Sequence, residues 1–242
     1  MSLAHPRVRA WRRRLRNAAL ARWYGLGQGV RCVFCGWQGR RFLPAGEPPH
    51  PNRLCPGCGS LERYRLTAHY LERSGLLREG QRILEMAPWP PLGAFCRAAP
   101  GVSYVSADLS SRAAMIRADL THLGARSHAF DLVICLHVLE HVDDDRAAFR
   151  ELRRVLRPGG VVLLMVPVRG EHTLERPTSS AEEREHLFGQ RDHVRFYGLD
   201  LRERLGGAGF QAEVVDLRAF FDPPTLDAFG LWGDDRFLFR AS

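Results

Sequence analysis

The pattern of hydrophobic positions is clearest in one central stretch, residues 130–167. Residues 132–136 form an unbroken apolar run of strand length, which predicts a strand covered on both faces. Asp143 can cap a helix that begins after it, because Asp is a common N-cap residue. After Asp143, apolar side chains recur at helical spacing. They are Ala148, Leu152, Val155 and Leu156. A Pro-Gly-Gly turn at 158–160 ends that helix, and residues 161–166 predict a second buried strand. Two strands joined through a helix form a right-handed βαβ unit, so a parallel sheet is predicted.

Further strands are predicted by similar apolar runs, each bounded by turn residues. They cover residues 102–107, 115–120, 211–217 and 237–240. Helical spacing predicts a helix over residues 60–79, ended by Gly80, and another over residues 199–205, ended by two glycines. Strands that alternate with helices along the chain predict an α/β fold with a mostly parallel sheet.

Length and composition fit one medium domain with a small appendage. The chain has 242 residues, of which 45% are hydrophobic, and this is enough for a core. No apolar run reaches about eighteen residues, so no transmembrane segment is predicted. No secretory signal pattern is visible, and we expect a cytoplasmic protein. The oligomeric state is left open.

The net charge of +8 is concentrated near the N-terminus. Residues 1–46 contain ten Arg and no acidic residue, whereas the other 196 residues hold 25 Arg against 27 acidic residues. The main part of the chain is therefore not predicted to be a basic surface for nucleic acid. The chain has no Lys, a bias that points to codon usage more than to selection for phosphate binding.

Residues 5–24 predict a basic amphipathic helix. The apolar face holds Val8, Trp11, Leu15, Ala18, Ala19 and Trp23, and the other face holds Arg9, Arg12, Arg13 and Arg16. Three roles stay open: docking on the neighbouring domain, binding to an anionic membrane or nucleic acid, and targeting as an organellar transit peptide. The predicted domains are this helical segment over 1–29, a small module over 30–60, a linking helix over 61–80 and the main domain over 81–242.

Four of the six cysteines form two C-x-x-C pairs, Cys32 with Cys35 and Cys55 with Cys58. Each pair can sit on a tight knuckle that directs both thiolates at one metal, and glycines beside them let the backbone turn back. The spacing predicts a four-thiolate Zn²⁺ site. Because thiolates take all four positions, this zinc would be structural and would allow a loop-rich module to fold. Its aromatic and Arg side chains suit packing on the neighbouring domain, which we favour, or stacking on single-stranded bases.

The segment FDLVICLHVLEHVDDDRAAFRELRRVLRPGGVVLLMVP, residues 130–167, resembles the fourth-strand to fifth-strand region of class I S-adenosylmethionine-dependent methyltransferases. A second segment, HLFGQRDHVRFYG at residues 186–198, resembles a signature of a bacterial branch that carries a zinc ribbon and often a degenerate glycine motif. The resemblance implies a Rossmann-like, seven-stranded sheet whose last strand is inserted antiparallel between the fifth and sixth. It also implies S-adenosyl-L-methionine as cofactor, bound beyond the carboxyl ends of the strands.

The loop after the first strand departs from the family pattern. By analogy with the family, residues 82–87 form the first strand. Family members end this strand on an acidic residue, here Glu85, and continue with Gly-x-Gly-x-Gly. Ala87, Trp89 and Pro91 stand where the glycines would be. Prolines remove N–H donors, so we expect a loop of another shape, in which Trp89 covers the cofactor or fills its space. Cofactor binding is therefore inferred from the rest of the domain.

Two acidic residues are predicted to bind the adenosine part of the cofactor. Asp108 ends the second strand 23 residues after Glu85, at the place of a ribose-binding acid, although it can also be an Asp that only begins a turn. Asp119 resembles the family residue that accepts a hydrogen bond from the adenine amine. The predicted cofactor set is Glu85, Met86, Ala87, Asp108, Leu109, Asp119, Leu120, Leu136, His137 and His141.

Histidines and the long segment of residues 168–198 supply the catalytic predictions. That segment leaves the carboxyl end of a strand, so we expect it to fold over the cofactor cleft. His193, beside Asp192, is the leading base, with a structural hydrogen bond as the alternative. His137 is interpreted as cofactor wall or as a second base. The predicted catalytic set is His193, His137 and Tyr197, and the predicted substrate ligands are Arg191 and Arg195.

Together with the resemblance, these residues predict a methyltransferase that acts on a hydroxyl or amine of a small molecule or glycan. No Asn-Pro-Pro-Tyr sequence follows the fourth strand, which argues against amide or base N-methylation of nucleic acids. Two alternatives stay open. One is an RNA methyltransferase held on RNA by the ribbon and the basic helix. The other is a protein that binds S-adenosylmethionine for another reaction or as a scaffold.

Overall fold

The computed structural model describes residues 24–25, 27–46, 49–176, 179–233 and 235–242, and it divides the chain into two compact units. Unit 1 comprises Met1–Tyr70 together with Phe221–Asp234. Unit 2 comprises Leu71–Phe220 together with Asp235–Ser242. Residues 1–23, which carry nearly all of the predicted basic helix, lie outside the described residues.

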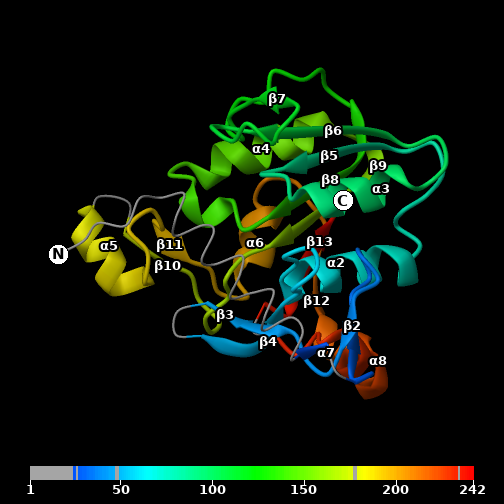
Figure 1. Ribbon diagram of the computed structural model, residues 1–242. Coiled ribbons are helices and arrows are strands. Elements are labelled where there is room, and N and C mark those ends of the chain that lie inside the picture. Colours follow the sequence, from blue (N-terminus) through cyan, green and yellow to red (C-terminus); the bar gives the residue numbers. More distant parts are fainter. Residues whose placement is uncertain (1–23, 26, 47–48, 177–178, 234) are drawn as a thin grey trace. The chain divides into compact units, whose positions relative to one another are not determined.

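Unit 2 is built on a seven-stranded sheet (Figure 1), with strand order β12-β13-β9-β8-β5-β6-β7. The strands are β5 Arg82–Met86, β6 Ser103–Asp108, β7 Ile116–Arg117, β8 Phe130–Leu136, β9 Leu156–Met165, β12 Ala212–Asp216 and β13 Phe237–Ala241. Strands β5 to β9 pair in parallel, whereas β13 is antiparallel to both of its neighbours, β9 and β12. The predicted fold class, including the place of the last strand, is confirmed.

The central βαβ unit consists of β8, helix α4 Asp145–Val155 and β9. Asp144, one residue later than predicted, caps the helix by accepting a 2.9 Å hydrogen bond from the N–H of Ala147. The helix ends at Val155, before the predicted turn. Residues 157–160 already belong to β9, where Gly159 adopts a φ of +75° and the pairing with β8 shifts in register. The Pro-Gly-Gly sequence therefore forms an irregular strand start rather than a helix stop.

Packing explains the unbroken apolar run of β8. Leu132, Val133, Ile134 and Cys135 are all almost fully buried, as expected for a central strand covered on both faces. The apolar face of α4, with Ala148, Leu152 and Val155, joins the same core cluster. The fourth residue that helical spacing placed with them, Leu156, belongs to the same cluster but is the first residue of β9.

The other elements of unit 2 are short. They are α3 Pro90–Arg97, the 3₁₀ turn η1 Leu139–His141, β10 Leu174–Glu175, α5 Ala181–Phe188, β11 Arg195–Phe196, α6 Leu201–Gly206 and α7 Leu217–Phe220. The segment of residues 168–198 is thus an excursion with structure of its own. Strands β10 and β11 pair antiparallel at its base, and α5 begins with a capping box formed by Ser180 and Glu183.

Within its described residues, unit 1 contains two small antiparallel strand pairs, the first part of one helix and the whole of another. The pairs are β1 Val30–Arg31 with β2 Gln38–Gly39, and β3 Leu43–Ala45 with β4 His50–Leu54; the helices are α2 Glu62–Arg73 and α8 Pro223–Phe229. The division between the units falls within α2. The grouping of residues 221–234 with residues 1–70 differs from the predicted boundaries, which assigned residues 81–242 to one domain.

Arg65 explains why residues 221–234 belong to unit 1. Its guanidinium is completely buried and donates hydrogen bonds to the carbonyl oxygens of Arg53, Ser60, Phe229 and Gly230, at 2.7 to 3.1 Å. Its Cζ also lies 3.9 Å from the centre of a Phe ring, that of residue 42. One charged side chain therefore joins three segments that are distant in sequence.

Among the described residues, no helix has both the length and the apolar composition needed to cross a bilayer.

Candidate functional sites: a four-cysteine cluster and a cavity at the strand ends

The two C-x-x-C pairs of unit 1 adopt the same local conformation. The N–H of Gly36 donates to the carbonyl of Cys32 at 3.0 Å, and the N–H of Gly59 donates to the carbonyl of Cys55 at 2.9 Å. Both glycines have positive φ, +69° and +78°, so each knuckle turns back after its second cysteine. The glycines that the sequence placed beside the cysteines therefore have the predicted role.

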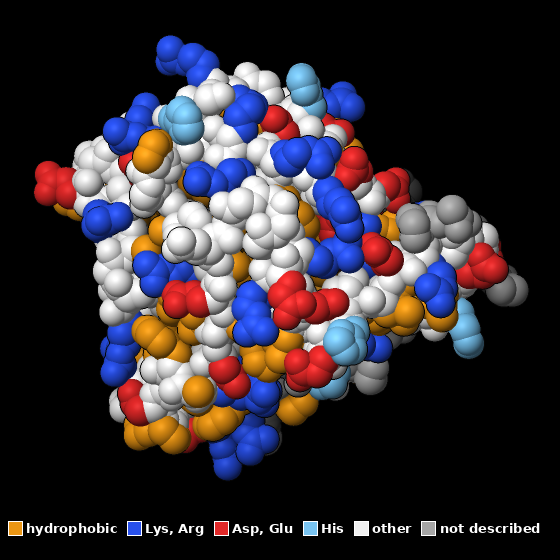
Figure 2. All heavy atoms as spheres, turned by 180° about the vertical axis from the view of Figure 1, so that it is seen from behind, with side chains coloured by type: hydrophobic (Ala, Val, Ile, Leu, Met, Phe, Trp, Pro, Cys, Tyr) orange, Lys and Arg blue, Asp and Glu red, His pale blue; other side chains and the backbone are white. Residues whose placement is uncertain are grey.

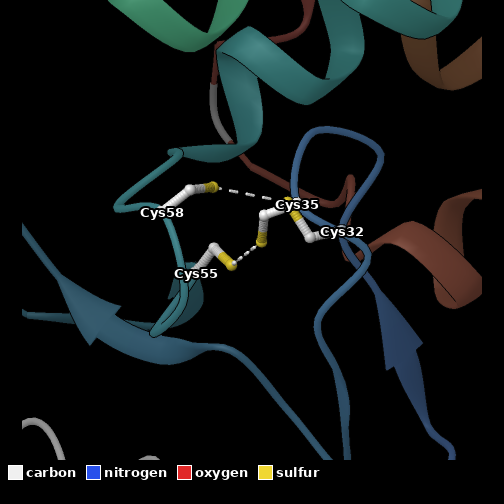
Figure 3. Close-up of side chains that lie close together, drawn as sticks. All are labelled: Cys32, Cys35, Cys55 and Cys58. Atoms are coloured by element: carbon white, nitrogen blue, oxygen red, sulfur yellow. Dashed lines mark hydrogen bonds between the residues drawn. The ribbon is translucent and has the colours of Figure 1, made fainter.

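Four sulfur atoms converge between the knuckles (Figure 3). Sγ of Cys32 lies 3.6 Å from Sγ of Cys58, and Sγ of Cys35 lies 3.6 Å from Sγ of Cys55. All four sulfurs lie within 4.8 Å of one another. A tetrahedral zinc site with Zn–S bonds of about 2.3 Å has S–S edges of about 3.8 Å. The donor set and its spacing fit a zinc ion, and Oγ of Ser60, 3.4 Å from the sulfur of Cys32, can hydrogen-bond a thiolate ligand.

Unit 2 contains a cavity of about 520 Å³ at the carboxyl ends of β5, β6 and β8. Its lining includes eight of the ten predicted cofactor residues: Met86, Ala87, Asp108, Leu109, Asp119, Leu120, His137 and His141. The remaining lining residues are Ser110, Ala118, Val138, Val142 and Asp192. Ligands of open α/β sheets bind at such strand ends, so this cavity is the candidate cofactor site.

The two acids of the cavity are held by their own turns. Oδ1 of Asp108 accepts hydrogen bonds from the N–H groups of Ser110 and Ser111, at 2.7 and 2.6 Å. Oδ1 of Asp119 accepts from the N–H and the hydroxyl of Thr121, both at 2.8 Å. Within the described part of the chain, no hydrogen bond reaches Oδ2 of either acid. Each carboxylate therefore has an oriented oxygen available to a hydroxyl or amine donor, which is what a ribose or an adenine amine requires.

Glu85 and Leu136 do not line the cavity. The carboxylate of Glu85 is buried, and it accepts one hydrogen bond from the N–H of Trp89 at 2.9 Å and another from the hydroxyl of Tyr104. Burial raises the pKa of this carboxyl, against the lowering effect of these hydrogen bonds and of Arg97. Glu85 thus organises the loop that follows it.

The loop itself corrects our expectation about its prolines. Pro90 and Pro91 form the first turn of α3, where main-chain N–H groups have no helical partner, so their missing donors remove no helical bond. Ala87 adopts a φ of +48°, a conformation that glycine tolerates best. Trp89 precedes α3 as its N-cap residue and is not part of the cavity lining. The glycine-poor sequence therefore still gives a strand-to-helix turn.

His137 lies at the tip of β8 with a φ of +55°. Its Nδ1 lies 3.2 Å from Oε1 of Glu140, and its Nε2 lies 3.4 Å from Oδ2 of Asp235. Burial opposes the charged imidazolium, but the hydrogen bonds and negative charges of Asp235 and Glu140 outweigh burial and raise the pKa of His137 to about 9. A histidine that keeps its proton at neutral pH is poorly suited to be a base, so the geometry favours the cofactor-wall interpretation.

His193 is buried close to the 3₁₀ turn after β8. Its ring lies 4.6 Å from the ring of His141, centre to centre, at an angle of 80°. Burial lowers the pKa of His193, and the neighbouring His141 and His137 add to this effect against Glu140 and Asp192. His193 therefore carries a neutral imidazole at neutral pH, the form that accepts a proton.

Arg195 and Tyr197 occupy places that do not suit their predicted roles. Arg195 is 1% exposed, and its guanidinium donates to the carbonyl oxygens of residues 139, 142 and 143 and to the carboxylate of Glu175. Tyr197 is completely buried and donates its hydroxyl hydrogen to Oδ2 of Asp145 at 2.9 Å. Arg191 is exposed and pairs with Glu182 and with a second acid of α5. None of the three lines the cavity.

Residues 76–164 match the family model described as a methyltransferase domain. Together with the sheet order, the comparisons support a class I methyltransferase. In structure, the chain is similar to an S-adenosylmethionine-dependent methyltransferase from Mesorhizobium loti, with a TM-score of 0.52 and 18% identity over 72% of this chain and 97% of that chain. Phosphoethanolamine N-methyltransferase 2 of Haemonchus contortus gives a TM-score of 0.52 and 20% identity over 76% of this chain and 53% of that one. At these identities, the likeness shows the fold.

Two curated relatives extend this methyltransferase match. A demethylmenaquinone methyltransferase of Mycolicibacterium paratuberculosis is 34% identical over 90 residues, which are 34% of this chain and 39% of the relative. A probable S-adenosylmethionine-dependent methyltransferase of Mycolicibacterium smegmatis is 29% identical over 184 residues, covering 71% of this chain and 68% of the relative. The chain thus spans well under half of the first relative and about two thirds of the second.

The two acidic partners of His137 were not predicted from the sequence. Glu140 and Asp235 surround His137, although they are separated by 95 positions along the chain. The regular spacing of the HVLEH sequence carried a signal for Glu140, because a turn after the strand brings residues i and i+3 together. No local pattern marked Asp235, which arrives only through the strand order of the sheet.

Proposed function

We propose that this protein transfers the methyl group of S-adenosyl-L-methionine to a hydroxyl or amine of a small molecule or glycan. The observation that carries this proposal is the cavity, where eight residues chosen from the sequence surround one space at the strand ends. Bound S-adenosylmethionine would supply an electrophilic methyl group, whose bond to sulfur breaks as the acceptor's lone pair forms a bond to the methyl carbon.

The residues of this chain have distinct proposed tasks. Asp108 would accept hydrogen bonds from the ribose hydroxyls, and Asp119 would accept one from the adenine amine, each through the oxygen that its own turn leaves available. The charged imidazolium of His137 would form one wall of the site. The acceptor's proton would pass to the cluster of Glu140, His141 and His193, whose member His141 lines the cavity.

The charge distribution supports a small acceptor over RNA. Figure 2 shows Arg and acidic side chains interspersed over the visible face, without a broad area of Arg alone. An RNA acceptor would favour a continuous basic surface. The four-cysteine cluster has no position left for a substrate, so its proposed role is a structural Zn²⁺ site that holds the fold of unit 1.

Calorimetry with S-adenosylmethionine and S-adenosylhomocysteine tests the cofactor part of the proposal. We expect micromolar binding of both by the full chain, and an Asp119→Asn variant should bind at least tenfold more weakly. Absence of binding at millimolar ligand would refute the proposal. Acceptors are then screened by the S-adenosylhomocysteine released.

Further measurements distinguish the two alternative functions, an RNA methyltransferase and a protein that binds S-adenosylmethionine for another purpose. Salt-sensitive binding of RNA that is lost on deletion of residues 1–60 would support an RNA methyltransferase. Tight cofactor binding without methyl transfer to any acceptor would support a scaffold or a different reaction of S-adenosylmethionine.

A further inference from the structure

A second cluster of metal-binding side chains lies in unit 2. It consists of Glu140 and His141, from the turn η1, and His193, from the return limb of the 168–198 excursion. One ligand atom from each of these residues lies within 4.8 Å of the others. Two imidazoles and one carboxylate are the donor set of many zinc sites and of open iron(II) sites. The mixed nitrogen and oxygen donors distinguish this cluster from the four thiolates of unit 1.

Burial makes these donor atoms unusual. Glu140 is 1% exposed and His193 is 4% exposed. Oε1 of Glu140 contacts Nδ1 of His137 as an ion pair, but in the part of the chain that the structure describes neither Glu140 oxygen has a well-oriented hydrogen bond. Nδ1 of His193 has no hydrogen-bond partner among those residues either. Buried polar atoms without partners are costly, and a bound cation would remove this cost.

A main-chain hydrogen bond joins the turn that carries Glu140 and His141 to the segment that carries His193. The N–H of Val194 donates to the carbonyl of Glu140 at 2.9 Å. The guanidinium of Arg195 holds the turn from the same side through carbonyl oxygens of Leu139, Val142 and Asp143. The ligand-bearing turn and the limb that carries His193 are therefore fixed in place by bonds that do not depend on the cluster.

The cluster adjoins the candidate cofactor cavity. His141 lines that cavity, and so does Asp192, whose Oδ2 lies 3.3 Å from Nδ1 of His141. Metal-binding histidines commonly have a carboxylate against their second ring nitrogen, which orients the ring. With only three protein ligands, one of which lines the cavity, the arrangement has the character of a catalytic rather than a closed structural site.

We propose that Glu140, His141 and His193 bind a divalent transition-metal ion, with Asp192 supporting His141. Imidazole ligands favour zinc, cobalt or iron(II) over magnesium and calcium. The role of the ion rests on the proposed function: it would bind the oxygen of an acceptor hydroxyl and make its proton more acidic, so that the proton leaves to solvent. The cluster would then act through the ion instead of as a free base.

Zinc content tests the binding without reference to activity. The full chain is dialysed against micromolar Zn²⁺, and zinc is counted by atomic emission. We expect about two zinc ions per chain, one at the cysteines and one at the new site. The variants Glu140→Gln and His141→Ala should each retain about one. His186→Ala, an exposed histidine of α5, is the matched control and should retain both.

Cobalt identifies which site is lost. Co²⁺ bound by thiolates gives strong charge-transfer absorption, whereas Co²⁺ bound by imidazole and carboxylate gives only weak visible bands. His141→Ala should lose the weak bands and keep the strong absorption. Because His141 is partly exposed, this variant should also keep its circular dichroism spectrum, which excludes unfolding as the cause.

One zinc per chain in the unaltered protein, or two in His141→Ala, would overturn the proposal. These measurements include neither S-adenosylmethionine nor an acceptor. A protein that binds two zinc ions but no S-adenosylmethionine would keep the metal site and refute the proposed function. A protein that binds S-adenosylmethionine but only one zinc ion would refute the metal site alone.

Discussion

The N–H of Trp89 donates a 2.9 Å hydrogen bond to the carboxylate of Glu85, four residues earlier in the chain. The hydroxyl of Tyr104 donates to the other carboxylate oxygen, so both oxygens are engaged inside the protein. A buried side chain thereby fixes a loop in which Ala87, Trp89 and Pro91 stand where the resemblance had led us to expect glycines. Gly93, one turn into α3, is needed for this arrangement, because a Cβ there would lie 2.5 Å from the Tyr104 hydroxyl.

Ala87→Gly should stabilise the protein. Ala87 has a φ of +48°, which costs a residue with a Cβ about 1 kcal/mol relative to glycine. We expect the free energy of unfolding, measured with urea, to rise by up to about 1 kcal/mol. Ala94→Gly, at an exposed position inside α3, is the control with the opposite sign and should lose about 1 kcal/mol. A loss in both variants would contradict the strain at Ala87.

Asp108→Asn should weaken binding of S-adenosylmethionine about tenfold, because a neutral amide forms weaker bonds with ribose hydroxyls and can present its N–H₂ group instead. Calorimetry of the full chain measures the change. Asp216→Asn at the end of β12 is the matched control, since Asp216 pairs with Arg236 and does not line the cavity. Equal affinities of the two variants would remove Asp108 from the cofactor site.

Cys35→Ser should release the zinc of unit 1. Cys35 is exposed, so the substitution removes a ligand without opening a core cavity. We expect loss of the strong cobalt charge-transfer absorption and rapid proteolysis within residues 27–60, because the metal supplies much of the folding free energy of so small a module. Cys96→Ala, far from the cluster in sequence, should keep the absorption. Retention of that absorption by Cys35→Ser would contradict the four-thiolate site.

Glu151→Gln should lower stability in a pH-dependent way. Hydrogen bonds from Arg154 lower the pKa of Glu151 to about 2, against burial and with help from the N–H of Leu123. Since the folded pKa lies below the unfolded value of 4.5, the ionised carboxylate stabilises the fold above pH 4.5, and this contribution disappears as the pH falls toward 2. Urea titrations at several pH values should show a deficit of about 1–2 kcal/mol at pH 7 that shrinks below pH 4.5.

Glu203→Gln is the control for that series. Glu203 is exposed on α6 and pairs with Arg202 at 3.5 Å, a kind of ion pair that contributes little. Its replacement should change the free energy of unfolding by less than about 0.5 kcal/mol at every pH. A Glu151→Gln deficit that persists unchanged at pH 3 would show that charge is not its cause.

Arg195→Lys should destabilise unit 2 by about 2–4 kcal/mol. The guanidinium donates hydrogen bonds to three carbonyl oxygens and one carboxylate at the same time, and an ammonium group cannot reach all of them. Arg191→Lys, exposed on the same excursion, should stay within about 0.5 kcal/mol of the unaltered protein. Chemical unfolding separates the two. Unchanged stability of Arg195→Lys would restore the substrate-binding role that the sequence had suggested.

Local patterns were sufficient to predict the central βαβ unit and the cysteine cluster, whereas the strand order was an implication of the family resemblance. The apolar run of β8, the helical spacing of α4 and the two C-x-x-C pairs each depend on residues close together in sequence, and each was found where expected. Most strand boundaries differed by a residue or two, although β7 ended three residues earlier than predicted. The LRPGG segment, which follows the last apolar residue of α4, joined β9 instead of a turn. Sheet pairing decided that outcome, and pairing is not visible in a local pattern.

The candidate site was harder to predict because its parts come from distant segments. Asp108 and Asp119 follow strands, so the sequence placed them correctly at the strand ends. The partners of His137 and His193 depend on a strand inserted from the C-terminus and on the return of a long excursion. The burial of Arg195 and Tyr197 depends on the same excursion, and polar residue types alone suggested an exposed role.

Arg65 sets an order of events during synthesis. Two of the carbonyl oxygens that it binds belong to residues 229 and 230, which leave the ribosome about 164 positions later. At a synthesis rate of about 5–20 residues per second, the segment that completes the core of unit 1 appears on the order of ten seconds or more after Arg65. A nascent chain that stalls before residue 221 would therefore expose an incomplete unit 1. Early binding of a metal ion by the four thiolates would protect this unit until the chain is finished.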